Sequence, residues 1–345
     1  MELAHPLDGL DAQPWSAVSH PHGSAADLPR LLRTLAGDDE AAAQEALSDL
    51  YECLLHQGNV HGASAQAVPF LARMAAAGHW TADVLVLLGG LAESEDEHDV
   101  APGAVRAAVA GQVPLLLPRL AAACPATRQA AAWAAAHTRD AAAVLPALRE
   151  RWRREDVPLV RAELLGGISR LDPQLGAALA ETVLGPRNPG ELRLAALFAC
   201  LDAGLPWTTA HHTTLLSLLP AEPLMAHRLD QQRSEPLWAV AQELLRRDTE
   251  EDRDAVTALL DSALRDERTE VRSGALWAAG EACRFSRGVP RRLLPALAPL
   301  AADADAGRDV RTLLSRLGTA AAAAAPALAA AARRNPDRAG PRTRG

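Results

Sequence analysis

The chain has 345 residues, among them 76 Ala and 55 Leu, and its 35 basic and 43 acidic residues give a net charge of −8. This composition favours helix, and a single Ile leaves strands short of the β-branched residues that they use. It excludes a largely disordered chain, and the Ala stretch at 320–332 is too short and too weakly hydrophobic to span a bilayer.

Two features of the sequence bear on where the protein resides. The N-terminus, Met1-Glu2-Leu3-Ala4-His5, has no basic leader, so we expect no secretion signal and a cytoplasmic location. The four cysteines are far apart and form no Cys-x-x-Cys motif, so we expect buried free thiols in a reducing compartment. They are Cys53, Cys124, Cys200 and Cys283.

A repeated step places helices along the chain. The pattern apolar-Pro-x-apolar first occurs at 28–31 and returns five times, with prolines 31 to 45 residues apart except for one gap of 149. Apolar residues then continue at the spacing of one helix face, and Pro is tolerated in a first helical turn. After a capping helix near 27–36, the predicted helix pairs are 39–56/64–77, 80–93/102–123, 126–138/141–154, 157–171/173–184, 189–203/208–220, 233–247/250–265, 268–284/289–303 and 306–317/320–333.

These pairs predict an all-α protein. Because one pair cannot bury its apolar face alone, stacking would build one continuous core. We expect a right-handed α-solenoid of about eight antiparallel helix pairs, forming a single domain over 27–333. A leader at 1–26 would pack on the first repeat, and a flexible Arg-rich tail would follow at 334–345.

A single Arg recurs early in the first helix of six pairs. The segments 270–280 and 309–318 are its clearest copies, and they resemble the first helix of HEAT repeats, whereas the Pro-containing helices resemble the second. In that family the early Arg commonly pairs with an acidic residue of a neighbouring repeat. We therefore expect these residues, called the Arg ladder here, to be structural, with Glu267, Glu270 and Asp309 as candidate partners. The ladder is Arg128, Arg161, Arg193, Arg233, Arg272 and Arg311.

Two N-terminal segments, 15–29 and 54–64, depart from the bare repeat. They resemble the opening of a broad group of bacterial HEAT-repeat proteins of unassigned function, in which a His/Gly segment precedes the first repeat and a His-Gln-Gly turn joins its helices. Because the other repeats offer only generic packing residues, we predict the binding site here. The candidate residues are His20, His22, His56, Gln57, Asn59 and His61, and a second candidate is a central groove at Arg149 and Arg153.

The chemistry of these histidines is left open by the sequence. His56 falls in a last helical turn, where it can cap carbonyl groups. If the leader folds back on the first repeat, the histidines and Asp49 or Glu52 could instead hold zinc. The sequence has no nucleophile elbow, phosphate loop or His-Glu-x-x-His, so we assign no catalytic residue, metal ligand or cofactor. Trp133, Trp238 and Trp277 fall in predicted first helices and are expected to pack in the core.

The uneven distribution of charge indicates the kind of partner. Residues 1–100 carry a net charge of −13, residues 101–283 carry −3, and residues 284–345 carry +8. The acidic end should attract basic proteins and repel phosphate backbones. We therefore expect a non-catalytic scaffold for a basic protein or peptide, such as an immunity or accessory protein, with no membrane partner. The alternatives are an enzyme or metal-dependent protein that uses the N-terminal histidines, or a nucleic-acid-binding protein such as a DNA glycosylase of HEAT-like architecture.

Overall fold

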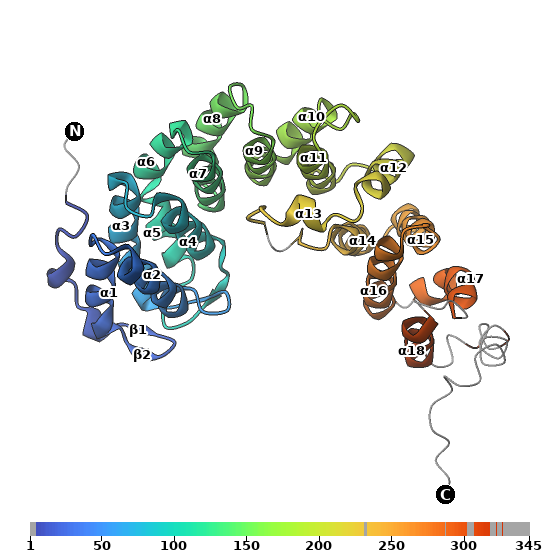
Figure 1. Ribbon diagram of the computed structural model, residues 1–345, viewed down its shortest axis with the longest axis horizontal. Coiled ribbons are helices and arrows are strands. Elements are labelled where there is room, and N and C mark those ends of the chain that lie inside the picture. The colour runs from blue at the N-terminus through green and yellow to red at the C-terminus, as the bar shows by residue number, and fades with distance from the viewer. Residues whose placement is uncertain are drawn as a thin grey trace, which may run out of the picture. The chain divides into compact units, whose positions relative to one another are not determined.

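The computed structural model describes residues 5–230, 233–286, 288–301 and 307–317, together with positions 322 and 326. Helices form most of this part of the chain, so the prediction of an all-α protein is confirmed (Figure 1). Within these residues strand is confined to four two-residue segments, and none of the described helices has the length and hydropathy needed to cross a bilayer. The predicted tail at 334–345 lies outside the described residues, as does the predicted helix at 320–333 apart from two positions.

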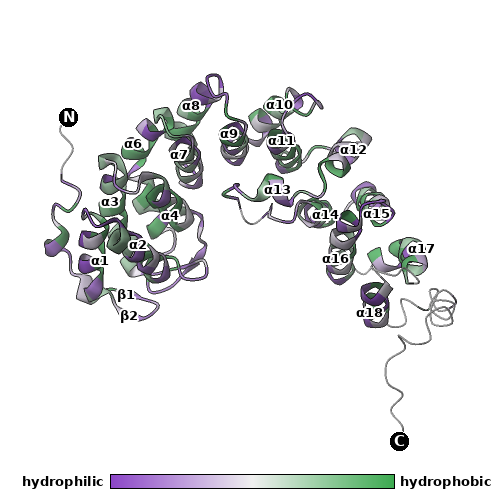
Figure 2. Ribbon diagram, in the orientation of Figure 1, coloured by the Kyte–Doolittle hydropathy of each residue, from purple (hydrophilic) through white to green (hydrophobic). Residues whose placement is uncertain are grey.

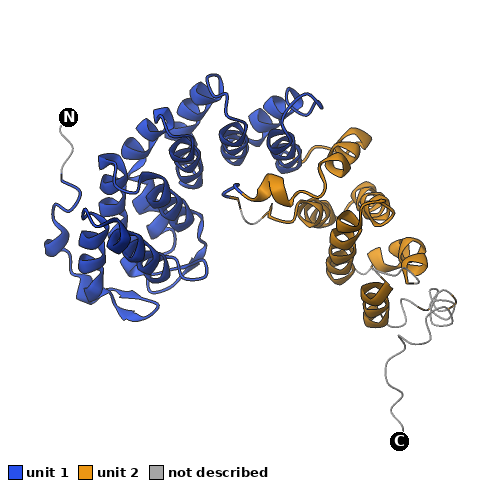
Figure 3. Cartoon of the chain, in the orientation of Figure 1, with its two compact units in different colours: residues 1–203, 227–229 blue, residues 204–226, 230–345 orange. Residues whose placement is uncertain are grey.

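The chain forms two compact units (Figure 3). Unit 1 comprises residues 1–203 and 227–229, and unit 2 comprises residues 204–226 and 230–345. The helices of unit 1 are α1 (Leu28–Leu35), α2 (Glu40–Leu54), α3 (Gly62–Ala77), α4 (Thr81–Glu93), α5 (Ala104–Ala110), α6 (Val113–Leu116), α7 (Pro125–His137), α8 (Ala141–Trp152), α9 (Pro158–Leu171), α10 (Pro173–Glu181) and α11 (Gly190–Asp202). Its strands are β1 (Ser19–His20), β2 (Gly23–Ser24), β3 (Asn59–Val60) and β4 (Asp96–Glu97).

In unit 1 the helices α4, α7, α9 and α11 pack against one another in that order, while α10 packs on α9 and α11. Small residues allow this close approach: all the alanines of α7 from Ala130 to Ala136 are buried. Figure 2 shows α4 largely in the colour of hydrophobic residues, in keeping with its position between α3 and α7. One buried apolar cluster extends from the leader to α9, so the leader shares its core with the helices that follow.

The segment predicted as one helix over 102–123 is interrupted. It forms α5, α6 and a 3-10 helix at Leu117–Ala121. Pro114 and Pro118 each lie at the start of one of the later pieces. Because Pro lacks an N–H and its ring clashes with the carbonyl of the preceding turn, each one ends the helix before it.

Unit 2 packs its helices in the same manner, with α16 in contact with α14, α15, α17 and α18. The short helix α13 falls in a segment that the sequence predicted as a connection. The helices are α12 (Thr209–Leu218), α13 (Glu222–Met225), α14 (Pro236–Arg247), α15 (Glu250–Leu264), α16 (Thr269–Phe285), α17 (Val289–Leu300) and α18 (Gly307–Leu317).

The Arg ladder holds helix starts to the turns around them. Arg128 makes a two-pronged pair with the buried carboxylate of Glu155, through Nε (2.8 Å) and Nη2 (2.9 Å). Arg272 instead donates to the backbone carbonyls of Asp266 and Glu267, so the side chain of Glu267 is not its partner. Other ladder contacts are Arg193 to the Leu184 carbonyl (3.2 Å), Arg311 to the Ala301 carbonyl (2.7 Å), Arg161 over the Trp152 ring (4.6 Å) and Arg233 to Asp230 (3.8 Å).

Two sequence-based expectations about burial are wrong. Cys124 is exposed, unlike the other three cysteines, because it is the N-cap residue of α7. There the backbone N–H groups of Thr127 and Ala126 lower the pKa of its thiol. Trp133 is buried as expected, but 47% of Trp277 is exposed, because hollows on α16 toward α14 and toward α18 leave its ring uncovered.

Candidate functional site

The leader is fastened to α3 by aromatic and cationic contacts. The buried ring of Trp15 lies 5.8 Å from that of Phe70, and its Nε1 donates to the carbonyl of Leu10 (2.8 Å). Arg73 covers the Phe70 ring and donates to the carbonyl of Asp8 (3.0 Å). These contacts fix the leader against the first helices, so the residues that follow it have a defined position.

The leader then forms a two-stranded hairpin. Strands β1 and β2 are antiparallel, with His20 opposite Gly23, and the tip consists of Pro21 and His22. Gly23 has φ +127°, a conformation that a residue with a side chain rarely adopts. The hairpin thus directs His20 inward, where it is 6% exposed, and leaves His22 exposed at the tip.

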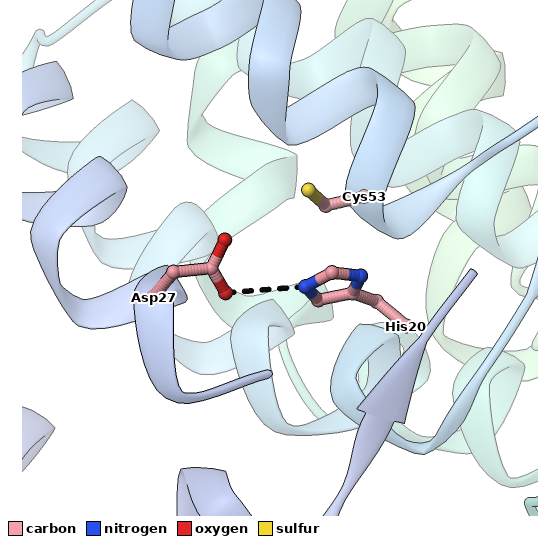
Figure 4. Close-up of side chains that lie close together, drawn as sticks. All are labelled: His20, Asp27 and Cys53. Carbon is pink, nitrogen blue, oxygen red and sulfur yellow. Dashed lines mark hydrogen bonds and ion pairs between the residues drawn. The ribbon is translucent and has the colours of Figure 1, made fainter. Parts of the chain in front are cut away.

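His20 is held by both of its ring nitrogens. Nδ1 accepts the backbone N–H of His22 (3.1 Å), and Nε2 lies 3.1 Å from a carboxylate oxygen of Asp27. The ring therefore carries its proton on Nε2 and donates it to Asp27. Figure 4 shows the thiol of Cys53, from α2, beside this pair, and the three donor atoms lie within 4.8 Å of one another.

Despite its His-Asp-Cys composition, this buried group is not arranged for nucleophilic catalysis. The nitrogen of His20 that could take a proton from a thiol already accepts a backbone N–H. Burial, and then the negative charges of Asp27, Asp49 and Glu52, together raise the pKa of the Cys53 thiol to about 11. Because the thiolate is the nucleophile, the thiol is inert near neutral pH. The contact between His20 and Asp27 ties the hairpin to the 3-10 helix Ala25–Asp27, and Cys53 of α2 lies beside it.

A second, exposed group lies directly beside it. His22 meets the His56 ring edge-on at 5.4 Å, and Nδ1 of His56 is 2.9 Å from a carboxylate oxygen of Glu52, one turn back along the chain. The donor atoms of these three residues also lie within 4.8 Å of one another. The sequence predicts that His20, His22, His56 and His61 converge if the leader folds back, with Asp49 or Glu52 as the carboxylate. The structure places the first three rings in succession, with Glu52 as the carboxylate, whereas His61 has a different ring neighbour.

The turn after α2 requires two residues with left-handed backbone. Gln57 has φ +52° and is exposed, and Gly58 has φ +87°. Asn59 then donates its backbone N–H to the carbonyl of His56 (2.9 Å) and enters β3, which pairs in parallel with β4. This pairing brings the loop after α4 alongside the turn.

His61, at the N-cap of α3, stacks on His98 from that loop, with ring centroids 5.2 Å apart. Burial, and then the neighbouring His98, lower the pKa of His61, so it is neutral at physiological pH. The sequence did not indicate His98 as a site residue. It lies 37 positions after His61, and only the pairing of β3 with β4 brings the two residues together. The one signal was the concentration of seven histidines in the first hundred residues.

We call His20, His22, His56, His61 and His98 the N-terminal histidine surface. Exposed carboxylates accompany it: the side chains of Asp27, Glu52 and Asp96 are 46%, 67% and 69% exposed. Three segments that are separate in the sequence build this surface, namely the leader hairpin, the turn from α2 to α3, and the loop after α4.

Arg149 and Arg153 lie elsewhere in unit 1. They are exposed at the C-terminal end of α8, which Figure 1 shows far from β1 and β2. Arg153 pairs with Glu150 at 2.9 Å. The structure therefore brings together six of the eight predicted site residues and leaves these two apart.

Comparisons with known proteins identify no family. No protein-family model and no curated protein matches the chain. One similar solved structure is an engineered protein from the Northeast Structural Genomics Consortium, with 17% identity and a TM-score of 0.38 over 88% of this chain and 82% of the other. A TM-score of that size does not establish a shared fold.

Proposed function

We propose that the chain is a non-catalytic scaffold that binds a basic protein or peptide at the N-terminal histidine surface. The observation that carries the proposal is the convergence of three segments into one surface, on which carboxylates, His22 and His98 are exposed, His56 and His61 are partly exposed, and His20 lies buried beneath. Such a surface complements a positively charged partner, which speeds encounter and disfavours acidic competitors. In this proposal the fold is a right-handed, HEAT-like α-solenoid of about eight helix pairs in one domain. The ordered packing of α4, α7, α9 and α11 supports that architecture.

The double variant His56→Ala/His61→Ala tests this proposal. It should keep its helix content by circular dichroism, because both side chains are only partly buried and lie outside the interiors of α2 and α3. The immobilised wild-type chain should capture a basic protein from an extract of its own cells at low salt, and the double variant should bind the purified protein at least about tenfold more weakly. Salt near 0.5 M should release the partner, because exposed charges are then screened over a few ångströms.

The matched control is His79→Ala/His227→Ala, which also removes two imidazoles but away from the N-terminal histidine surface; His79 follows the opposite end of α3 from His61. It should bind like the wild-type chain. If the double variant at His56 and His61 binds normally, and Arg149→Ala/Arg153→Ala does not, the binding site is the α8 surface and the assignment is wrong.

A second candidate function is binding of a transition-metal ion by His22, Glu52 and His56. Two imidazoles and a carboxylate are a ligand set suited to zinc, and three protein ligands leave one tetrahedral position open. The buried group fits an ion less well, because His20 carries its proton on the nitrogen that faces Asp27.

Zinc titration by calorimetry separates this candidate from the scaffold alone. One zinc ion should bind per chain, with at least about tenfold weaker binding after His22→Ala, and zinc should raise the melting temperature because it binds only the folded chain. Cys53→Ser should bind zinc as the wild-type chain does. Equal binding by His22→Ala, or a loss of binding with Cys53→Ser, would exclude this ligand set.

A further inference from the structure

Unit 2 exposes two large aromatic side chains that both pack on the ring of Trp238. Trp277 is 47% and Phe285 48% exposed, and among the described residues they are the large hydrophobic side chains most open to solvent. Both lie on α16, and both meet Trp238 of α14 at nearly right angles, with centroids 6.4 Å and 6.1 Å from its ring. Apolar surface gathered in this way on a protein marks an interaction site, whereas single exposed apolar residues do not.

A pocket of about 380 Å³ opens beside these rings, between α13, α14 and α16. Its floor is apolar and includes Met225, Leu237 and Val271, all buried. The rings of Trp238 and Trp277 form one side. We call the pocket and these rings the aromatic groove. It lies entirely within unit 2, away from the residues of the proposed N-terminal site.

The charged residues of the groove all have the same sign. Glu222, Glu235 and Glu270 line it and are exposed, and within the described part of the chain no Arg or His lines it and none of the three forms an ion pair. Arg268 lies at the edge of the groove, where it pairs with Asp266 (2.7 Å) and donates to the carbonyl of Leu219, and its charge also interacts with that of Glu270. The groove therefore presents three carboxylates beside an aromatic wall, and none of the three is in an ion pair within the described part of the chain.

We propose that the aromatic groove binds an Arg or Lys side chain of a basic peptide segment from a separate partner. The faces of Trp and Phe attract a cation, and Trp does so most strongly. The apolar floor accommodates the methylene stem of such a side chain while its charged end meets the glutamates. Arg suits the site better than Lys, because its planar guanidinium both stacks on an aromatic face and pairs with a carboxylate through two hydrogen bonds.

Charge complementarity selects this occupant over others of similar shape. An anionic or neutral apolar ligand would leave the three carboxylates facing it without a counter-charge, which disfavours binding. The inference goes beyond the proposed function, because it assigns a different surface and the side chain that the surface accepts.

Fluorescence anisotropy with a labelled eight-residue peptide of alternating arginine and serine tests the assignment on the full chain. The wild-type protein should bind it, and the same peptide with citrulline, a neutral analogue of arginine, should bind at least about tenfold more weakly. Trp277→Ala and Glu270→Gln should each weaken binding of the arginine peptide by a similar factor. Glu270 is exposed and forms no ion pair, so Glu270→Gln should unfold at the wild-type temperature. Trp277→Ala loses the contact with Trp238, so its melting temperature should fall, and Glu270→Gln is the variant that separates binding from folding.

The matched control is Glu181→Gln, which makes the same change of charge at an exposed position of unit 1 outside both proposed sites, and it should leave binding within about twofold of wild type. The assignment is overturned if the wild-type chain does not bind the arginine peptide, or if Trp277→Ala and Glu270→Gln bind it normally. A loss of binding only with Glu52→Gln would place the peptide on the N-terminal histidine surface instead.

Removal of residues 333–345, which contain five arginines, tests whether the occupant is a separate partner. The shortened chain should bind the arginine peptide with unchanged affinity. A gain of about tenfold would overturn the assignment to a separate partner, because the chain's own C-terminal segment would then compete for the groove.

Discussion

The pair formed by Arg128 and Glu155 shows how a single charged residue can hold neighbouring helices together. The side chain of Glu155 is fully buried and that of Arg128 is 8% exposed. Arg128 also donates to the carbonyls of Ala122 and Ala123, and Glu155 accepts hydrogen bonds from Arg151 and the backbone of Val157. Since every donor and acceptor has a partner, the cost of burying the two charges is offset, and removal of either one would leave the other charge buried alone.

This network predicts a pH-dependent stability. Burial would raise the pKa of Glu155, but hydrogen bonds from Arg128, Val157 and Arg151 outweigh it and hold the pKa at about 2. Because the carboxyl titrates near 4.3 in the unfolded chain, the stabilisation is complete above that pH and is lost as the pH falls toward about 2. Glu155→Gln should lower the free energy of unfolding at neutral pH by about 3–5 kcal/mol and flatten its decline in this acidic range, as measured by urea unfolding.

The control for this prediction is Glu150→Gln, since Glu150 is exposed and pairs with Arg153 on the surface. It should change the free energy of unfolding by less than about 1 kcal/mol. If Glu155→Gln unfolds at the same urea concentration as the wild-type chain, the pair contributes nothing net to stability.

At the scale of helices, two helices can approach closely where one of them has a glycine and a larger side chain would clash with the other. In α4, a Cβ at Gly89 would lie 2.2 Å from ring carbons of Trp133 in α7 and 3.1 Å from the backbone of Ala134. The buried ring cannot move aside without displacing its neighbours, because protein interiors are close-packed. Gly274, in α16, has no atom within 4 Å of the same position.

These two glycines predict opposite effects of one substitution. Gly89→Ala should destabilise the protein by about 1–3 kcal/mol through overpacking between α4 and α7. Gly274→Ala should stabilise it by up to about 1 kcal/mol, because Ala favours the helix and meets nothing. Thermal unfolding of both variants checks the pair. A melting temperature that rises for Gly89→Ala would show that α4 and α7 are less tightly packed than described.

The helices were predictable to the extent that they follow local rules. Helical spacing and early prolines located most of them to within a few residues. Pro114 and Pro118 divide one predicted helix, although a Pro inside a helical pattern is itself a local signal for a break. The same rules could not reveal β3 and β4, since two-residue strands carry no periodicity and depend on a partner 37 residues away.

The candidate site was predictable where a segment had an unusual composition. His20, His22 and His56 attracted notice as histidines in glycine-containing segments, and the structure places them together. The exposure of Trp277 could not be predicted, because the sequence pattern of a Trp among alanines on a helix predicts a buried residue. Which face of α16 stays uncovered is decided by α14 and α18, not by the sequence of α16 itself.

At the scale of the whole molecule, charge is divided between the units. The residues that carry a net charge of −13, 1–100, belong to unit 1, and those that carry +8, 284–345, belong to unit 2. Yet the charged residues that line the aromatic groove of unit 2 are all glutamates. Net charge thus governs long-range attraction, whereas the side chains of a particular pocket govern what it accepts.

Residues 227–229 have a consequence for how the gene can be divided. Arg228 lies 3.3 Å from the buried carboxylate of Glu163, and Gln129 donates to the carbonyl of His227 (2.7 Å). A protein shortened at Ala203 would therefore retain the α9 carboxylate but lose the guanidinium that neutralises it. A gene fragment that recombination cut at this junction would encode a protein with a buried carboxylate that has lost the pairing cation, and its fold would be less stable. We therefore expect the coding segments of the two units to be inherited as one piece.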